Sequence, residues 1–178
     1  MKAVVVYESM YGNTHLIADA IATGLRTDTG ADVVVVPVDE AHAGVLVGAD
    51  LVVVGGPTHA HGLSRQSTRK AAIDAARKPD SDLTVDPDAE GPGLREWFDA
   101  SEHLATRAAA FDTRVKGPAT LTGRASKGIA KRLRDHDCTL IVEPESFLVT
   151  KENHLFDDEA AHAREWGARL AAAIAEPH

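Results

Sequence analysis

The 178-residue chain is poor in cysteine, in long apolar runs and in net positive charge. Its single cysteine, Cys138, excludes an internal disulfide framework and a cysteine-rich zinc site. No apolar run approaches the ~20 residues that a membrane-spanning helix needs. The formal charge of -8 argues against a nucleic-acid-binding surface. The first residues do not show the basic segment followed by an apolar segment that is typical of a signal peptide. We therefore expect a cytoplasmic protein without membrane or nucleic-acid partners.

Two common nucleotide-binding motifs are also missing. The sequence contains neither the GxxxxGK[ST] loop that holds nucleoside triphosphates nor the GxGxxG turn that holds dinucleotides. In contrast, its content of 44% hydrophobic and 26% charged residues is that of an ordinary globular protein. We expect one domain over residues 1–178, long enough to enclose a single core.

The chain does contain a strand, a hydroxyl-rich loop and a helix in direct succession near its start. Residues 3–7 (AVVVY) form an apolar run typical of a strand that is buried on both faces. A helical pattern follows the loop, so backbone N–H groups and the positive end of the helix dipole point at one spot, which favours an anion. The loop offers neutral hydroxyls and no lysine, and this predicts a phosphomonoester. The candidate contacts are Ser9, Met10, Tyr11, Gly12, Asn13 and Thr14.

This loop resembles the flavodoxin signature, in which an aromatic residue ends the first strand and a hydroxyl, a small residue, a threonine and an alanine follow. The matching residues are Tyr7, Ser9, Gly12, Thr14 and Ala18. The resemblance implies non-covalently bound FMN. It also implies an α/β fold, a flavodoxin-like three-layer sandwich around a five-stranded parallel sheet of order 2-1-3-4-5. The alternative is a hydroxyl-rich turn in which Asn13 or Ser9 only caps the helix.

The rest of the chain alternates strand and helix patterns, which indicates right-handed βαβ units and a parallel sheet. Further strands are expected at residues 32–38, 50–55 and 107–111, with a last strand at 138–142 and 146–149 that is broken at Glu143 and Pro144. Helices are expected at residues 39–47, 64–78, 94–104 and 158–174, with a basic helix capped by Ser126. In such sheets ligands lie at the carboxyl ends of the strands where the strand order reverses, a rule for which flavodoxins are themselves a standard example.

The segment after the third strand, GGPTHAHG, resembles the second flavin-contacting loop of flavodoxins. The resemblance implies contacts from Pro57, Thr58, His59, Ala60, His61 and Gly62. Gly55, Gly56 and Gly62 would permit close backbone approach. Many flavodoxins place an aromatic residue here, where this chain offers the two histidines. A metal hypothesis for this pair finds no carboxylate or cysteine at ligand spacing, so we expect no metal site, and a solvated loop histidine is the alternative for one of them.

The segment after the fourth strand is a candidate by position. In a flavodoxin-like protein it would contact the pyrimidine end of the flavin, and the candidates are Asp112, Thr113, Arg114 and Gly117. A cation at Arg114 would favour the reduced, anionic flavin, and Lys116 would act in the same direction if it turned inward. The alternative is a solvated Arg114.

An acidic segment, residues 80–90, contains no basic residue. It is expected either to be a solvated loop or to be a docking surface for a basic redox partner.

No Ser/His/acid triad or catalytic pair of carboxylates can be assembled from the spacing, so we expect no catalytic side chain and a function that depends on the flavin. The leading hypothesis is an FMN-binding electron-transfer protein whose partners are a flavoprotein reductase and an electron acceptor. One alternative is an NAD(P)H-dependent reductase of quinones or related acceptors on the same fold. Another is a flavin-free binding module, since fold does not fix function. The sequence leaves the oligomeric state open.

Overall fold

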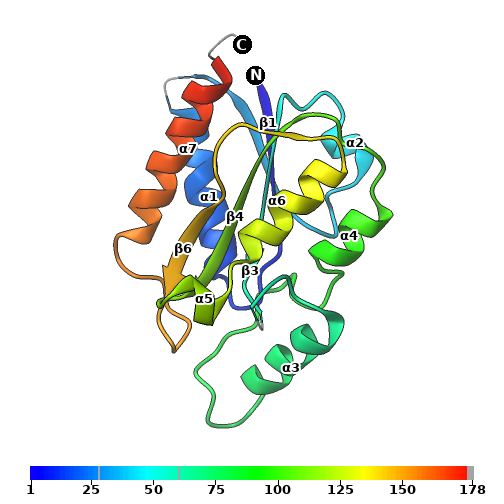
Figure 1. Cartoon of the computed structure of the whole chain (residues 1–178). Coiled ribbons are helices and arrows are strands. Elements are labelled where there is room, and N and C mark those ends of the chain that lie inside the picture. Colours follow the sequence, from blue (N-terminus) through cyan, green and yellow to red (C-terminus); the bar gives the residue numbers. More distant parts are fainter. Residues whose placement is uncertain (28, 60, 176–178) are drawn as a thin grey trace.

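A computed structural model describes residues 1–27, 29–59 and 61–175, and a parallel β-sheet lies at its centre (Figure 1). The strand order is β2-β1-β3-β4-β5, and β6 also pairs with β4. Every strand pair is parallel. The strands are β1 (Lys2–Tyr7), β2 (Asp32–Pro37), β3 (Leu51–Pro57), β4 (Arg107–Val115), β5 (Thr139–Leu140) and β6 (Glu145–Val149). The predicted order 2-1-3-4-5 is confirmed.

The continuous apolar runs of the central strands are explained by burial on both faces. Side chains alternate across a strand, so Val4 and Val6 of β1 enter one core cluster while Ala3 and Val5 enter the other. All four are fully buried. A strand that faces two cores needs apolar residues at every position, which is the pattern the sequence shows.

Helices cover both faces of the sheet (Figure 1). The helices are α1 (Asn13–Arg26), α2 (Ala43–Leu46), α3 (Gln66–Ala76), α4 (Leu94–Ala100), α5 (Ala119–Thr122), α6 (Ala125–Asp135) and α7 (Glu159–Ala175). Helices α1 and α7 contribute to one core cluster, and α4 and α6 contribute to the other. Among the described residues, no helix is long and apolar enough to cross a bilayer.

The outer strand beside β4 is broken in two, as the sequence predicts. β5 pairs with the start of β4 at Arg107 and Ala108, and β6 pairs with its end from Phe111 to Val115. The fifth position of the sheet is therefore filled by two short strands. β3 and β4 also run further than expected, because their pairing continues through Gly56 with Asp112 and Pro57 with Thr113. Several candidate site residues thus lie in the sheet edge instead of in loops.

One expected helix cap and several expected helix bounds are wrong. α6 follows Arg124, so Ser126 is not its cap, and α3 follows Arg65, so the helix expected at residues 64–78 begins only at Gln66. Ser64 is buried and accepts a hydrogen bond from Arg69 Nη1 at 3.1 Å, while Ser126 lies in the first turn of α6. The helix expected at 39–47 is limited to α2, and the one expected at 94–104 ends at Ala100.

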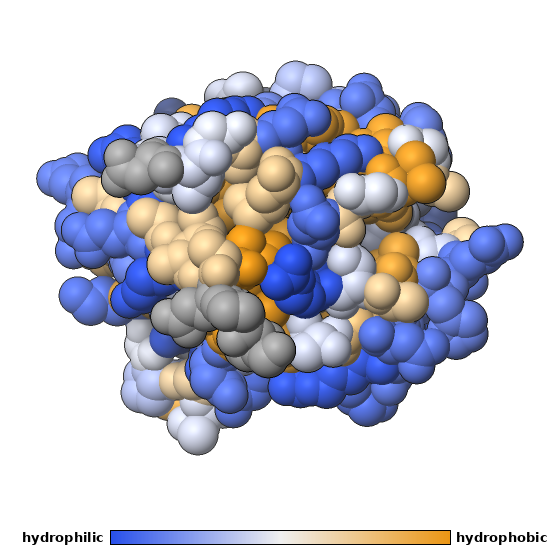
Figure 2. All heavy atoms as spheres, turned by 90° about the horizontal axis from the view of Figure 1, so that it is seen from above, coloured by the Kyte–Doolittle hydropathy of each residue, from blue (hydrophilic) through white to orange (hydrophobic). Residues whose placement is uncertain are grey.

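Helix α3 packs on loops and not on the sheet. Its only buried apolar residue is Ile73, which forms a small cluster with Met10 and Ala89. Ala71 of the same helix is exposed. α3 lies beyond the carboxyl ends of the strands (Figure 1). At the opposite end of the sheet, the surface is mostly hydrophilic with small hydrophobic patches (Figure 2).

Candidate functional site

The loop between β1 and α1 has the geometry of an anion site. Gly12 precedes the helix with φ 88°, a left-handed conformation that glycine adopts without strain. No side-chain hydrogen bond caps α1, so the alternative in which Asn13 or Ser9 is the cap residue is wrong. Ser9 Oγ instead accepts a hydrogen bond from Gly12 N at 3.1 Å, and its own hydrogen stays free to donate. The unsatisfied N–H groups of the first helical turn face the same loop.

Hydrogen bonds join this loop to the ends of two other strands. Thr14 Oγ1 lies 2.8 Å from Thr113 Oγ1 of β4, and both side chains are buried. Asn13 Nδ2 donates to the carbonyl oxygen of Asn153, which follows β6, at 2.6 Å. The carboxyl ends of parallel strands meet at one edge of a sheet, and these two contacts join the loop to that edge.

The turn after β3 is held from two sides. Thr58 N donates to Thr113 O at 2.8 Å, and Thr58 Oγ1 accepts from Ala125 N at 3.0 Å. Within the turn, His59 and Gly62 exchange backbone hydrogen bonds of 2.8 and 2.9 Å. His61 has φ 75° and lies in a β-bridge with Gly123. The remaining candidate of this turn, Ala60, lies outside the described residues.

These elements enclose a cavity of about 400 Å³ at the carboxyl edge of the sheet. That volume lies within the range of small-molecule sites. The predicted residues that line it are Ser9, Met10, Tyr11, Asn13, Thr14, Pro57, Thr58, His59, Thr113 and Arg114. The predicted residues that do not line it are Gly12, His61, Gly62, Asp112 and Gly117.

Asp112 has a structural role that its expected loop position did not suggest. It is fully buried within β4, and its Oδ2 accepts a hydrogen bond of 2.7 Å from Ser126 N in the first turn of α6. Burial raises the pKa of the Asp112 carboxyl, and the Ser126 hydrogen bond opposes that rise. Asp112 therefore caps α6 from the neighbouring strand, and its expected location in a loop is wrong.

Arg114 is held at the cavity wall by hydrogen bonds from Nη1, and its Nε is left for another acceptor. Its Nη1 donates to Gly117 O at 2.9 Å and to Thr122 Oγ1 at 3.1 Å. Its Nε is buried and has no hydrogen-bond partner within the described part of the chain. In contrast, Lys116 Nζ lies 5.0 Å from the ring centroid of Phe156, so this cation is engaged elsewhere.

His59 lines the cavity, and its imidazole is affected by the charge of Arg69. Burial and the positive charge of Arg69 lower the pKa of His59, which keeps its imidazole neutral near pH 7. Arg69 is itself buried and forms an ion pair of 3.2 Å with Glu96. Nearby, Glu8 Oε2 accepts a hydrogen bond of 2.8 Å from Leu94 N, and burial raises the pKa of this carboxyl.

Some cavity residues were not predicted from the sequence, and they come from α3, from the end of β4, and from the end of β6 and the turn that follows it. They are Thr68, Ala71, Ala72, Val115, Val149 and Asn153. α3 reaches the site because Tyr11 OH donates to Ala72 O at 2.8 Å. No local signal marks Thr68 or Ala72. Asn153 could have been expected, because it follows a strand whose carboxyl end meets the same sheet edge.

The donor groups of the cavity fit a phosphorylated planar molecule such as FMN. Hydroxyls and a helix N-terminus gather at the Ser9–Thr14 end, where an anion is favoured. The free Nε of Arg114 is a buried donor that needs an acceptor, and a ring carbonyl could supply one.

Comparison with known proteins agrees with this geometry. The flavodoxin family model matches residues 5–88. The family model thus covers a little under half of the chain, and the segment it matches is similar to flavodoxins. The matched segment contains the loop of β1 and α1 and the turn after β3. No curated protein matches the chain in sequence.

Solved structures show the same fold over the whole chain. An archaeal flavodoxin superposes with a TM-score of 0.67 at 21% identity, covering 99% of this chain and 100% of that one. Flavodoxin 1 of Bacillus cereus has a TM-score of 0.65 at 20% identity, with 97% and 98% covered. Rubredoxin oxygen:oxidoreductase of Desulfovibrio gigas has a TM-score of 0.63 at 18% identity, and the match covers 98% of this chain but 37% of that protein. The fold thus occurs both as a separate protein and as part of larger redox enzymes.

Proposed function

We propose that the protein binds FMN in the cavity at the carboxyl edge of the sheet and carries electrons between redox proteins. The observation that carries the proposal is the cavity itself, which has an anion site at the Ser9–Thr14 loop and a buried cationic donor, Arg114, on its wall. Bound FMN would supply the one- or two-electron chemistry. The protein side chains bind it, orient it and set the charge around it.

The phosphate is held by the loop in this proposal. Ser9 and Thr14 donate hydroxyl hydrogens, and the first N–H groups of α1 complete the cradle. Thr14 can do so because the hydroxyl of Thr113 is free to donate to Thr14 Oγ1, which leaves the Thr14 hydrogen for the phosphate. No lysine or metal is needed for a single phosphate group.

The ring lies against the turn after β3 in this proposal. Pro57, Thr58 and His59 form one wall, and Thr113 and Arg114 form another. A neutral His59 contributes a flat, uncharged surface. Arg114 Nε would donate to a carbonyl oxygen at the pyrimidine end, and its positive charge would stabilise the reduced ring.

Flavin titration tests the cofactor. Full-length apoprotein is titrated with FMN, riboflavin and FAD while flavin fluorescence is followed. We expect FMN to bind at least 100-fold more tightly than riboflavin, because hydrogen bonds to a charged group contribute about 1.5–3 kcal/mol each. Equal affinity for FMN and riboflavin would overturn the proposal.

Steady-state kinetics distinguish a carrier from an enzyme. No nicotinamide-binding fingerprint is present, so we expect slow reduction by NADH or NADPH alone and fast reduction through a flavoprotein reductase. Tyr11 is the only Phe, Tyr or Trp among the described cavity residues, and an uncovered ring face is what a reductase of quinones would need. Rapid turnover of a quinone with NADPH would therefore favour the reductase alternative.

A further inference from the structure

The acidic segment 80–90 is not a uniform solvated loop. Asp80 and Asp82 are exposed, but the Asp86 side chain is 2% exposed and faces α1. The segment is attached to the Ser9–Thr14 loop, because Asp86 N donates a hydrogen bond to Met10 O at 2.8 Å. A buried carboxylate needs a hydrogen-bond donor, a positive charge or a metal. The groups around Asp86 should therefore show which of these three partners stabilises its carboxylate.

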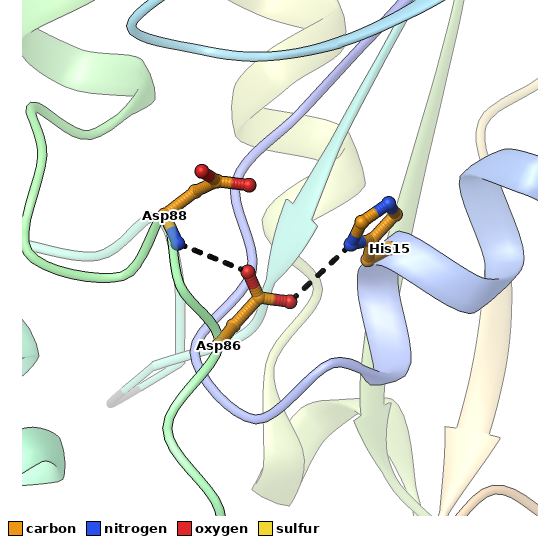
Figure 3. Close-up of side chains that lie close together, drawn as sticks. All are labelled: His15, Asp86 and Asp88. Atoms are coloured by element: carbon orange, nitrogen blue, oxygen red, sulfur yellow. Dashed lines mark hydrogen bonds and ion pairs between the residues drawn. The ribbon is translucent and has the colours of Figure 1, made fainter.

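Three possible ligand groups meet at this point. His15 Nδ1 lies 3.5 Å from Asp86 Oδ2, and one ligand atom each from His15, Asp86 and Asp88 lie within 4.8 Å of one another. Figure 3 shows His15 on α1 facing the two aspartates on the acidic segment. Two ligands each about 2.1 Å from one ion are at most ~4.2 Å apart. Side-chain movements of under ~1 Å would therefore complete a site.

The hydrogen bonds around the three groups leave the facing atoms available. Asp86 Oδ1 accepts from Asp88 N at 3.1 Å, but Asp86 Oδ2 accepts no hydrogen bond from any described residue. Within the described part of the chain, no lysine or arginine forms an ion pair with Asp86 or Asp88. The oxygen aimed at His15 thus belongs to a buried side chain that still lacks a strong partner.

Tyr7 contacts both His15 and Asp88, and Asp19 contacts His15, so these two residues help to orient the possible ligands. The Tyr7 ring stacks on the His15 ring at 4.4 Å between centroids, and Tyr7 OH donates to Asp88 Oδ2 at 3.2 Å. Asp19 Oδ2 lies 3.8 Å from His15 Nε2, on the far side of the imidazole. A histidine ligand commonly has a carboxylate at its other nitrogen, which sets the tautomer that coordinates metal.

We propose that His15, Asp86 and Asp88 form a binding site for a first-row divalent cation such as Zn²⁺. One imidazole nitrogen and two carboxylate oxygens suit such an ion, and three protein ligands leave room for water. The site lies beside the cavity and not in it, since none of the three residues lines the cavity. This inference does not rest on FMN binding. It also departs from the expectation, drawn from His59 and His61, that the chain has no metal site.

Calorimetric titration of Zn²⁺ into chelator-treated, full-length protein tests the proposal. We expect one high-affinity equivalent per chain. His15→Phe keeps a ring to stack on Tyr7 but removes the ligand, and Asp86→Asn keeps the shape of the side chain but removes its charge. Each change should weaken Zn²⁺ binding at least 100-fold. Asp19→Asn should weaken it by about 10-fold, the effect of an outer carboxylate.

A matched control is His103→Phe, because His103 Nδ1 lies 2.8 Å from Asp137 Oδ2 in an exposed pair elsewhere on the surface. This variant should keep the high-affinity equivalent. Circular dichroism checks that each variant is folded. If His15→Phe does not fold, the Zn²⁺ affinity of Asp86→Asn tests the proposal instead. The absence of a high-affinity Zn²⁺ equivalent, or its persistence in folded Asp86→Asn, would overturn the proposal. Cobalt substitution gives a second readout, since a protein-bound Co²⁺ absorption band should appear in the wild type and not in Asp86→Asn.

Discussion

The hydroxyl groups of Thr14 and Thr113 lie 2.8 Å apart and join the first turn of α1 to β4. Both residues are buried. If one hydroxyl is removed, the other remains buried without a hydrogen-bond partner, which lowers the free energy of unfolding by about 1–3 kcal/mol. Replacing both hydroxyls with apolar groups of the same shape can be nearly neutral. We therefore expect Thr14→Val and Thr113→Val each to lower the free energy of unfolding by about 1–3 kcal/mol. In urea unfolding, the double variant should lose less unfolding free energy than the two single variants added together.

The same pair separates phosphate binding from stability. In the proposed function Thr14 donates to the phosphate and Thr113 donates to Thr14. Thr14→Val should weaken FMN binding by about 1–3 kcal/mol, and Thr113→Val should weaken it less. Riboflavin affinity is the control and should change little in either variant, because riboflavin has no phosphate. Equal losses of FMN affinity in both variants would contradict this assignment.

Gly55 is required by the packing of the sheet. An added Cβ at Gly55 would lie 2.1 Å from Phe111 Cζ. Overfilling a core in this way costs about 1–3 kcal/mol and occasionally more. We expect Gly55→Ala to lower the unfolding free energy by at least that much, measured by urea denaturation. The glycine expected to permit approach to a ligand is thus needed for an aromatic side chain of its own core.

A matched control for this change is Gly62→Ala. An added Cβ at Gly62 meets no atom of the described residues within 4 Å, so the expected change is within about 0.5 kcal/mol. Gly55→Ala combined with Phe111→Leu should lose less stability than the two single changes added together, because leucine leaves room for the methyl group. Additive losses would show that Phe111 is not the obstacle.

His59 should make stability depend on pH. Burial and Arg69 lower its pKa in the folded state, so below about pH 6.5 the unfolded chain binds this proton more readily than the folded chain does. Stability therefore falls as the pH drops through the unfolded pKa towards the folded one. We expect the wild type to lose more unfolding free energy than His59→Gln between pH 8 and pH 5. His154→Gln, at an exposed position, controls for the loss of an imidazole, and parallel pH profiles of wild type and His59→Gln would disprove the expectation.

Arg114 should raise the potential of the semiquinone/hydroquinone couple of bound FMN. Two unit charges about 6 Å apart at an effective dielectric near 20 interact by roughly 3 kcal/mol, and exposure reduces this to about 1. For a one-electron couple, about 1.4 kcal/mol corresponds to ~59 mV. Arg114→Gln should lower the potential by some tens of millivolts in a spectroelectrochemical titration.

Arg114→Lys keeps the charge but removes Nε, so its potential should fall less than that of Arg114→Gln. Lys116→Gln should have a small effect, because Lys116 Nζ lies over the Phe156 ring. An unchanged potential in FMN-bound Arg114→Gln would show that the guanidinium does not act on the ring.

The positions of the central strands and of the Ser9–Thr14 loop could be predicted from local patterns, namely continuous apolar runs for strands that face two cores and a hydroxyl-rich turn before an amphipathic helix. The strand order 2-1-3-4-5 was implied by the resemblance of this loop to the flavodoxin signature. The break of the last strand at Pro144 was equally local, since proline removes a backbone donor. Predictions of this kind need only neighbouring residues.

Tertiary structure alone decided which distant side chains meet. Asp86 lies beside His15, Asp112 caps α6, and Thr113 bonds to Thr14, although each pair is distant in sequence. α3 packs its one buried apolar residue, Ile73, on Met10 of the Ser9–Thr14 loop, because α4 and α6 already bury that face of the sheet. Periodicity shows which face of an element is apolar, but only the competition among all elements for the same buried surface determines what that face contacts.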